Sequence, residues 1–157
     1  MPDAPALDPM TVEPRTATVY PEPLALATVG RAKRSLTAAL GLSQFGVNVV
    51  DLAPGAASAL RHWHSHEDEF VYVLEGEVTL VTDAGEQVLA AGLCAAFPGG
   101  KEDGHCLVNR SDEPARILEI GSRDMRDEGN YPDDDLHCHA GRYEKVRFTR
   151  KDGTPIE

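Results

Sequence analysis

One stretch decides how this chain is interpreted: residues 55–76, which read GAASALRHWHSHEDEFVYVLEG. Three of the six histidines fall within five residues of it, at His62, His64 and His66. Because side chains two positions apart point to the same face of an extended strand, this spacing brings the imidazoles together. A carboxylate, Glu69, follows where an apolar run begins. Imidazoles beside a carboxylate suit a divalent transition metal, so the stretch predicts half of a metal site.

The other half lies downstream in residues 92–109, GLCAAFPGGKEDGHCLVN. Here a predicted strand ends at Pro98, a glycine-rich turn reverses the chain, and the lone His105 opens the next strand.

The two stretches together resemble the two signature motifs of the cupin superfamily. The first motif contains a Gly, His-x-His, three or four residues, Glu, six residues and Gly, and it is matched by Gly55, His62, His64, Glu69 and Gly76. The second contains Gly, five residues, Pro-x-Gly, His, three residues and Asn, and it is matched by Gly92, Pro98, Gly100, His105 and Asn109. The gap before His62 is one residue longer than in the family pattern, and the gap before His105 is two residues longer.

The resemblance implies an all-β fold, a cupin-type double-stranded β-helix (jelly-roll) barrel with short N-terminal helical turns. It also implies that four residues bind the metal: His62, His64, Glu69 and His105. Three imidazoles and one carboxylate would leave two octahedral positions open, and Zn, Mn, Fe and Ni all suit such a site.

Two classes of function remain open for such a chain. One is a small metalloenzyme acting on a polar small molecule, similar to the sugar or sugar-phosphate isomerases or to the dioxygenases of the family. The other is a non-catalytic cupin that binds or senses a small molecule, with a structural metal. No catalytic residue is identified by the motifs; Glu119, in the last barrel strand, is the candidate for a general base. The only cations near the motifs are Arg61, Lys101 and Arg110, which is thin support for a phosphorylated substrate.

Composition narrows the class of protein. A chain of 157 residues fits one domain. Its 26 acidic and 15 basic residues give a net charge of -11, which disfavours nucleic acid and anionic membrane partners. No apolar run approaches the ~18 residues of a transmembrane helix, and no secretory signal is visible. Three cysteines without C-x-x-C spacing favour a reducing cytoplasm.

We divide the chain into three parts: an arm (1–40), the barrel (41–122) and a charged extension (123–157). The arm holds six of the eleven prolines in its first 23 residues, and short helical turns, broken at Gly30 and stopped at Gly41, are expected after them. The extension should begin as a surface loop over 123–135 and contain an edge strand at 146–149. The expected barrel strands are 45–52, 58–64, 69–74, 77–82, 86–90, 93–97, 105–110 and 115–122.

An apolar outer face is expected on the strand that follows Glu69. If Glu69 points into the barrel, Phe70, Tyr72 and Leu74 point outward. An exposed apolar patch of that kind requires a cover, so a homodimer is predicted, with the arm as the other candidate cover.

Several residues near the motifs have simpler interpretations. His66 is expected near the ligands or on the surface, and Glu67 and Asp68 in a solvated turn, although Glu67 would replace Glu69 if the register slipped. Cys94 and Cys106 should be small buried side chains. The pair His137 and His139 has the spacing of two ligands of a second metal site, but the sequence shows no third partner at a recognisable spacing.

Overall fold

The computed structural model describes residues 5–156; residues 1–4, the start of the proline-rich arm, and residue 157 lie outside the described part. The elements in chain order are η1 (Pro9–Thr11), η2 (Leu24–Thr28), β1 (Arg31–Ser35), α1 (Leu36–Leu40), β2 (Phe45–Leu52), β3 (Trp63–His64), β4 (Glu69–Glu75), β5 (Glu77–Thr82), β6 (Gly85–Ala90), β7 (Cys94–Phe97), β8 (Cys106–Val108), β9 (Ala115–Ser122), β10 (Gly129–Tyr131), β11 (Leu136–Cys138) and β12 (Phe148–Thr149). None of the helices among the described residues has the length and apolar character needed to cross a membrane.

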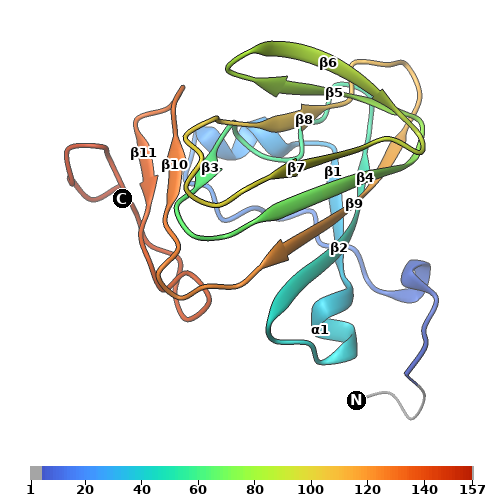
Figure 1. Ribbon diagram of the computed structural model, residues 1–157, viewed down its shortest axis with the longest axis horizontal. Coiled ribbons are helices and arrows are strands. Elements are labelled where there is room, and N and C mark those ends of the chain that lie inside the picture. The colour runs from blue at the N-terminus through green and yellow to red at the C-terminus, as the bar shows by residue number, and fades with distance from the viewer. Residues whose placement is uncertain (1–4, 157) are drawn as a thin grey trace.

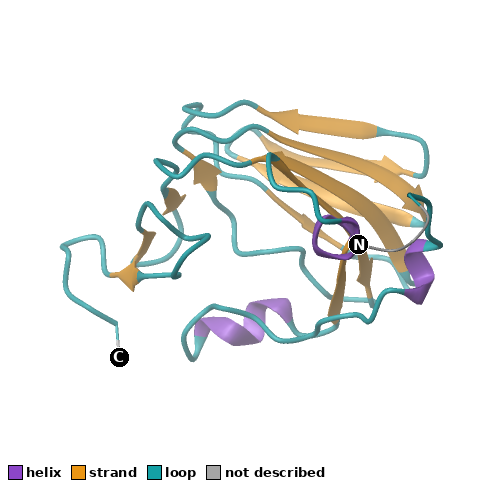
Figure 2. Ribbon diagram, turned by 90° about the horizontal axis from the view of Figure 1, so that it is seen from below, coloured by secondary structure: helices purple, strands orange, loops and turns teal. Residues whose placement is uncertain are grey.

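Antiparallel sheets build the barrel (Figure 1). The larger sheet has the strand order β1-β2-β9-β4-β7, and a three-stranded sheet has the order β6-β5-β8. A third sheet, β12-β11-β10-β3, lies beside one end of these two sheets (Figure 1). The short helices lie at the margins of the strand layers (Figure 2). The predicted all-β barrel with short N-terminal helical turns is therefore confirmed.

Alternation along the strands separates the core from the surface. In β4, Val71 and Val73 are 5% and 0% exposed, whereas Tyr72 and Leu74 are 38% and 40% exposed. The predicted inward and outward faces of this strand are therefore correct. The buried core between the sheets consists of Val50, Leu52, Ala56, Val71, Val73, Val78, Leu80, Leu89, Leu107, Ala115 and Ile117.

Strand β1 was not expected from the sequence, because its residues, RAKRS, carry three positive charges. It pairs with β2, and the register sets Arg31 opposite Leu52 and Lys33 opposite Val50. Directly paired residues share a face of the sheet, and Leu52 and Val50 are both core residues. The two cations therefore point into the barrel. The expected helical turns are present on either side as η2 and α1, and α1 ends at Gly41 with φ 70°.

The charged extension is more ordered than expected. Residues 123–135 do not form only a surface loop, because β10 lies within them and Asp127 is 0% exposed. Tyr131, Leu136 and Cys138 form a second small core. The predicted edge strand is confirmed as β12, at the margin of the third sheet.

Candidate metal centre

The backbones of the two motifs meet directly. The His62 N–H donates to the His105 carbonyl at 3.1 Å, and the His105 N–H donates to the His62 carbonyl at 2.9 Å. The expected strand over 58–64 is reduced to this bridge and to β3. A Cβ atom at Gly99 would lie 2.7 Å from the His66 carbonyl carbon, so the two motif loops pack without room for a side chain there.

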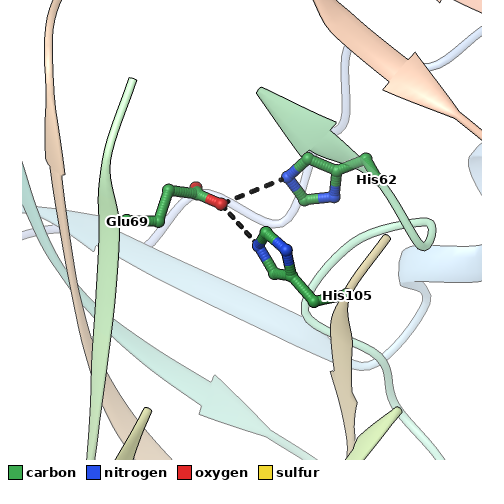
Figure 3. Close-up of side chains that lie close together, drawn as sticks. All are labelled: His62, Glu69 and His105. Atoms are coloured by element: carbon green, nitrogen blue, oxygen red, sulfur yellow. Dashed lines mark hydrogen bonds and ion pairs between the residues drawn. The ribbon is translucent and has the colours of Figure 1, made fainter. Parts of the chain in front are cut away.

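Three imidazoles converge on one carboxylate, and Figure 3 shows two of them, His62 and His105, beside Glu69. The Glu69 Oε2 atom lies 2.6 Å from His105 Nε2 and 3.5 Å from His62 Nε2. The other oxygen, Oε1, lies 3.5 Å from His64 Nε2. All four residues implied by the cupin resemblance are therefore brought together, with His62, Glu69 and His105 forming the tightest group.

The spacing of these atoms fits a small divalent ion. Metal–ligand bonds of about 2.1 Å at right angles place neighbouring ligand atoms about 3.0 Å apart. The 2.6 and 3.5 Å distances from Glu69 to the imidazole nitrogens bracket that value. Small side-chain movements would therefore open the cluster around an ion.

The outer ring nitrogens orient two of the imidazoles. His62 Nδ1 lies 2.7 Å from the Leu60 carbonyl oxygen, and His64 Nδ1 lies 2.7 Å from Asp127 Oδ2. An acceptor at Nδ1 keeps the proton there and leaves Nε2 as the free metal donor. His105 differs, because its buried Nδ1 has no partner among the described residues. Its ring instead stacks on Phe97, with centroids 3.5 Å apart.

Asp127 is the supporting residue that the sequence did not reveal. Its side chain is fully buried, and Oδ1 accepts hydrogen bonds from the backbone N–H groups of His66 and Glu67 at 2.9 and 3.2 Å. The carboxylate therefore fixes the loop between the first-motif histidines and Glu69 while it orients His64. It is one acid among several in a charged stretch, and no pattern there distinguishes it.

The charges of the cluster are strongly coupled. Burial opposes ionisation of Glu69, but contacts with the three imidazoles outweigh it and hold its pKa well below the usual range. Burial also opposes protonation of His64, yet hydrogen bonds to Asp127 and Glu69 raise its pKa to about 9. Burial dominates at His105 and lowers its pKa, which favours the neutral ring that a metal requires.

Glu67 is not the solvated turn residue that the sequence suggested. It is 2% exposed, forms an ion pair with Arg142, and accepts a hydrogen bond from the Tyr143 hydroxyl at 2.5 Å. Glu69 faces the imidazoles, whereas Glu67 lies in a separate buried group with His64 and Asp127. His66 and Asp68 are exposed, as expected for surface positions.

A third partner for the C-terminal histidine pair comes from a neighbouring loop. Glu128, His137 and His139 each offer one ligand atom, and these atoms lie within 4.8 Å of one another. The fold therefore supplies a third potential ligand that the sequence spacing did not reveal. Glu128 precedes the histidine pair by several positions in the sequence, so spacing alone did not connect them. The antiparallel pairing of β10 with β11 brings Glu128 next to the pair.

The cluster of His62, His64, Glu69 and His105 lies in the wall of a cavity of about 370 Å³. Arg31, Lys33 and Glu119 line the same cavity, and Lys33 Nζ lies 2.8 Å from Glu119 Oε2. Arg31 and Lys33 are cations that the sequence did not connect with the motifs, because their strand precedes the barrel motifs and was not expected.

The fold and the paired motifs define the class of protein. The sequence matches the cupin domain family over residues 48–121, and the chain belongs to the cupin superfamily. No match was found among curated proteins.

Two solved structures resemble this chain over most of its length. A sugar phosphate isomerase of the cupin superfamily from Silicibacter pomeroyi is 47% identical, with a TM-score of 0.92, and the match covers 98% of this chain and 97% of that one. A protein from Acidithiobacillus ferrooxidans with a proposed sugar phosphate isomerase activity is 28% identical, with a TM-score of 0.72, over 81% and 80% of the two chains. The polyketide cyclase RemF from Streptomyces resistomycificus is 23% identical, with a TM-score of 0.62 over 76% and 79%, and shares the fold alone.

Proposed function

We propose that this protein is a metal-dependent isomerase that acts on a sugar phosphate. The observation that carries the proposal is the 47% identity to the Silicibacter pomeroyi sugar phosphate isomerase across 98% of this chain. The convergence of three imidazoles on Glu69 in the wall of a cavity also supports the proposal, because a metal ion held there would lie beside a bound substrate. A dioxygenase uses similar ligands, but the two long structural matches favour isomerisation.

The proposed metal ligands are His62, His64, Glu69 and His105. Neutral imidazoles and a carboxylate suit Zn, Mn, Fe and Ni alike, so the ligand set does not choose among them. Once bound, the ion would supply a Lewis acid that polarises a substrate carbonyl. The residues of the chain provide the geometry, because Leu60 and Asp127 fix the rings.

Isomerisation of a sugar requires a group that moves a proton between neighbouring carbons. Glu119 is the candidate, since it lines the same cavity and its register partner Val71 points inward. Lys33 holds the Glu119 carboxylate in place through the 2.8 Å ion pair. The role proposed for Glu119 is therefore to accept and return that proton.

Metal content and turnover test the function together. Purified protein should contain one tightly bound transition metal ion at this centre and should interconvert aldose and ketose phosphates. His62→Ala should lose both, whereas the matched control His66→Ala should lose neither, because His66 is exposed. A His62→Ala variant that keeps its metal would overturn the ligand assignment. If wild type binds metal but converts no member of a broad sugar-phosphate panel, the non-catalytic binding function replaces the isomerase.

A homodimer remains our proposal for the assembly. Tyr72 and Leu74 on the outer face of β4 are exposed, and Leu93 beside them is 48% exposed. An apolar patch on a sheet is a candidate surface for a second copy. Light scattering should give twice the chain mass for wild type, whereas the Leu74→Glu variant should have the mass of a single chain. The control Val88→Glu, also exposed but on β6, should leave the mass unchanged. A monomeric wild type would refute the dimer.

We also propose that the protein resides in the cytoplasm. The three cysteines are free thiols, with Cys94 exposed and Cys106 and Cys138 buried, so the prediction that Cys94 is buried was wrong. An exposed thiol fits the reducing cytoplasm that we propose for this protein.

A further inference from the structure

Arg31 is a buried cation inside the barrel. The side chain is on the inner face of β1, and the residue is only 9% exposed. It lines the same cavity of about 370 Å³ as His62, Glu69 and His105. A guanidinium stays charged under all physiological conditions, so this wall of the cavity carries a permanent positive charge.

The charge of Arg31 is not neutralised by the described part of the chain. Its Nη1 atom donates to the Ser58 carbonyl at 2.7 Å, and its buried Nε has no hydrogen-bond partner within residues 5–156. Of the other cations that line the cavity, Lys33 pairs with Glu119 and Arg142 with Glu67, whereas Arg15 and Arg123 are exposed to solvent. No carboxylate of residues 5–156 forms an ion pair with Arg31.

A buried charge without a counter-ion is costly, so it implies a ligand that supplies one. Desolvation of an unpaired ion costs several kcal/mol, and an unmet buried donor adds about 1–3 kcal/mol. A planar guanidinium matches the oxygens of phosphate or carboxylate with parallel hydrogen bonds. Two tyrosines, Tyr20 and Tyr131, line the same cavity with their ring centroids 5.8 Å apart, and their hydroxyls are further donors.

We infer that Arg31 binds the phosphoryl group of the substrate in the cavity that it shares with His62, Glu69 and His105. This inference rests on the proposed function and names the subsite that recognises the phosphate. The backbone links the two sites, because Ser58, which holds Arg31, lies on the segment that leads to His62. The cavity volume falls within the 300–1,000 Å³ usual for small-molecule pockets. A sugar phosphate would thus be oriented with its carbonyl end toward the imidazoles.

Anion binding to metal-stripped protein tests this subsite independently of turnover. Inorganic phosphate is titrated calorimetrically into wild type, Arg31→Met and the control Arg110→Met at constant ionic strength. Arg110 is an exposed cation paired with Glu86, so its loss changes the net charge equally without touching the cavity. Arg31→Met should weaken phosphate binding about 10- to 100-fold, which is the usual loss for a charge-assisted hydrogen bond. Arg110→Met should stay within about twofold of wild type.

Equal phosphate affinity in wild type and Arg31→Met would overturn the inference. Malonate is titrated in parallel, and tighter binding of that dicarboxylate than of phosphate would also overturn it. Should Arg31→Met fail to fold, the wild-type Nε–H signal of Arg31 in a ¹⁵N spectrum gives the answer. That signal should shift saturably with phosphate and not with chloride, and an unmoved signal refutes the subsite.

The outcome is separable from that of the proposed function. Phosphate affinity is measured without metal or turnover. If the isomerase function were refuted, weaker phosphate binding by Arg31→Met would still show that Arg31 forms an anion site. The converse outcome is an active isomerase whose Arg31→Met variant keeps the wild-type KM for a phosphorylated sugar. That result would support the proposed function and refute the phosphate subsite.

Discussion

Asp127→Asn should weaken metal binding through the orientation of His64. In wild type, Oδ1 accepts two backbone N–H groups and Oδ2 lies 2.7 Å from His64 Nδ1. An asparagine would keep its carbonyl oxygen toward the backbone N–H groups, which places its NH₂ against Nδ1. A donor at Nδ1 drives the imidazole proton to Nε2, the atom that should bind the metal.

The expected loss is about 10- to 100-fold in metal affinity, the usual effect of removing such a supporting partner. That range corresponds to about 1.4–2.7 kcal/mol, and it agrees with the ~1.5–3 kcal/mol contributed by a hydrogen bond to a charged group. The loss of a proton from His64 accompanies metal binding, and its pKa is raised to about 9 because hydrogen bonds to Asp127 and Glu69 outweigh burial. At about pH 8.5, this proton competition lowers the apparent affinity by only about fourfold.

The assay is calorimetric titration of metal-stripped protein with Ni²⁺. Both the variant and its reference carry His137→Ala and His139→Ala, so that the Glu128 group contributes no heat. Asp112→Asn, in an exposed turn, is the matched control and should bind as wild type. If folded Asp127→Asn bound Ni²⁺ within twofold of its reference, the orienting role of Asp127 would be refuted.

Three further outcomes are expected. Glu119→Gln should retain metal but lose at least about 100-fold in kcat, measured by single-substrate kinetics; unchanged turnover would exclude Glu119 as the proton carrier. In a thiol-reagent assay at pH 8, Cys94 should react quickly and Cys106 only after unfolding, because burial raises the pKa of the Cys106 thiol to about 11. Gly76→Ala should lower the free energy of unfolding in urea by about 1–3 kcal/mol, since φ is 73° and a Cβ would lie 2.7 Å from the Pro114 carbonyl oxygen. Gly85→Ala, at positive φ but in open space, should cost less.

The sequence by itself determined most strands of the barrel and the four candidate ligands, but not β1, β10 or β11. Alternation places Val71 and Val73 inside, because successive side chains of a strand point to opposite faces. The first-motif ligands were recognisable because their spacing is local: His62 and His64 are two positions apart, and Glu69 follows five positions later at the start of β4. Only the pairing of His62 with His105 needed a distant segment, and the second motif supplied it.

The tertiary structure alone decided what surrounds those ligands. Asp127, Arg31 and Glu67 lie in charged stretches whose composition predicts exposed positions, yet the fold buries all three. Asp127 is buried because β10 pairs with β3 and carries the preceding loop onto the ligand loop. Arg31 is buried because β1 pairs with β2 in a register that turns it inward. Whether a charge faces solvent or a cavity depends on strand pairing between segments distant in sequence, and no local pattern encodes that pairing.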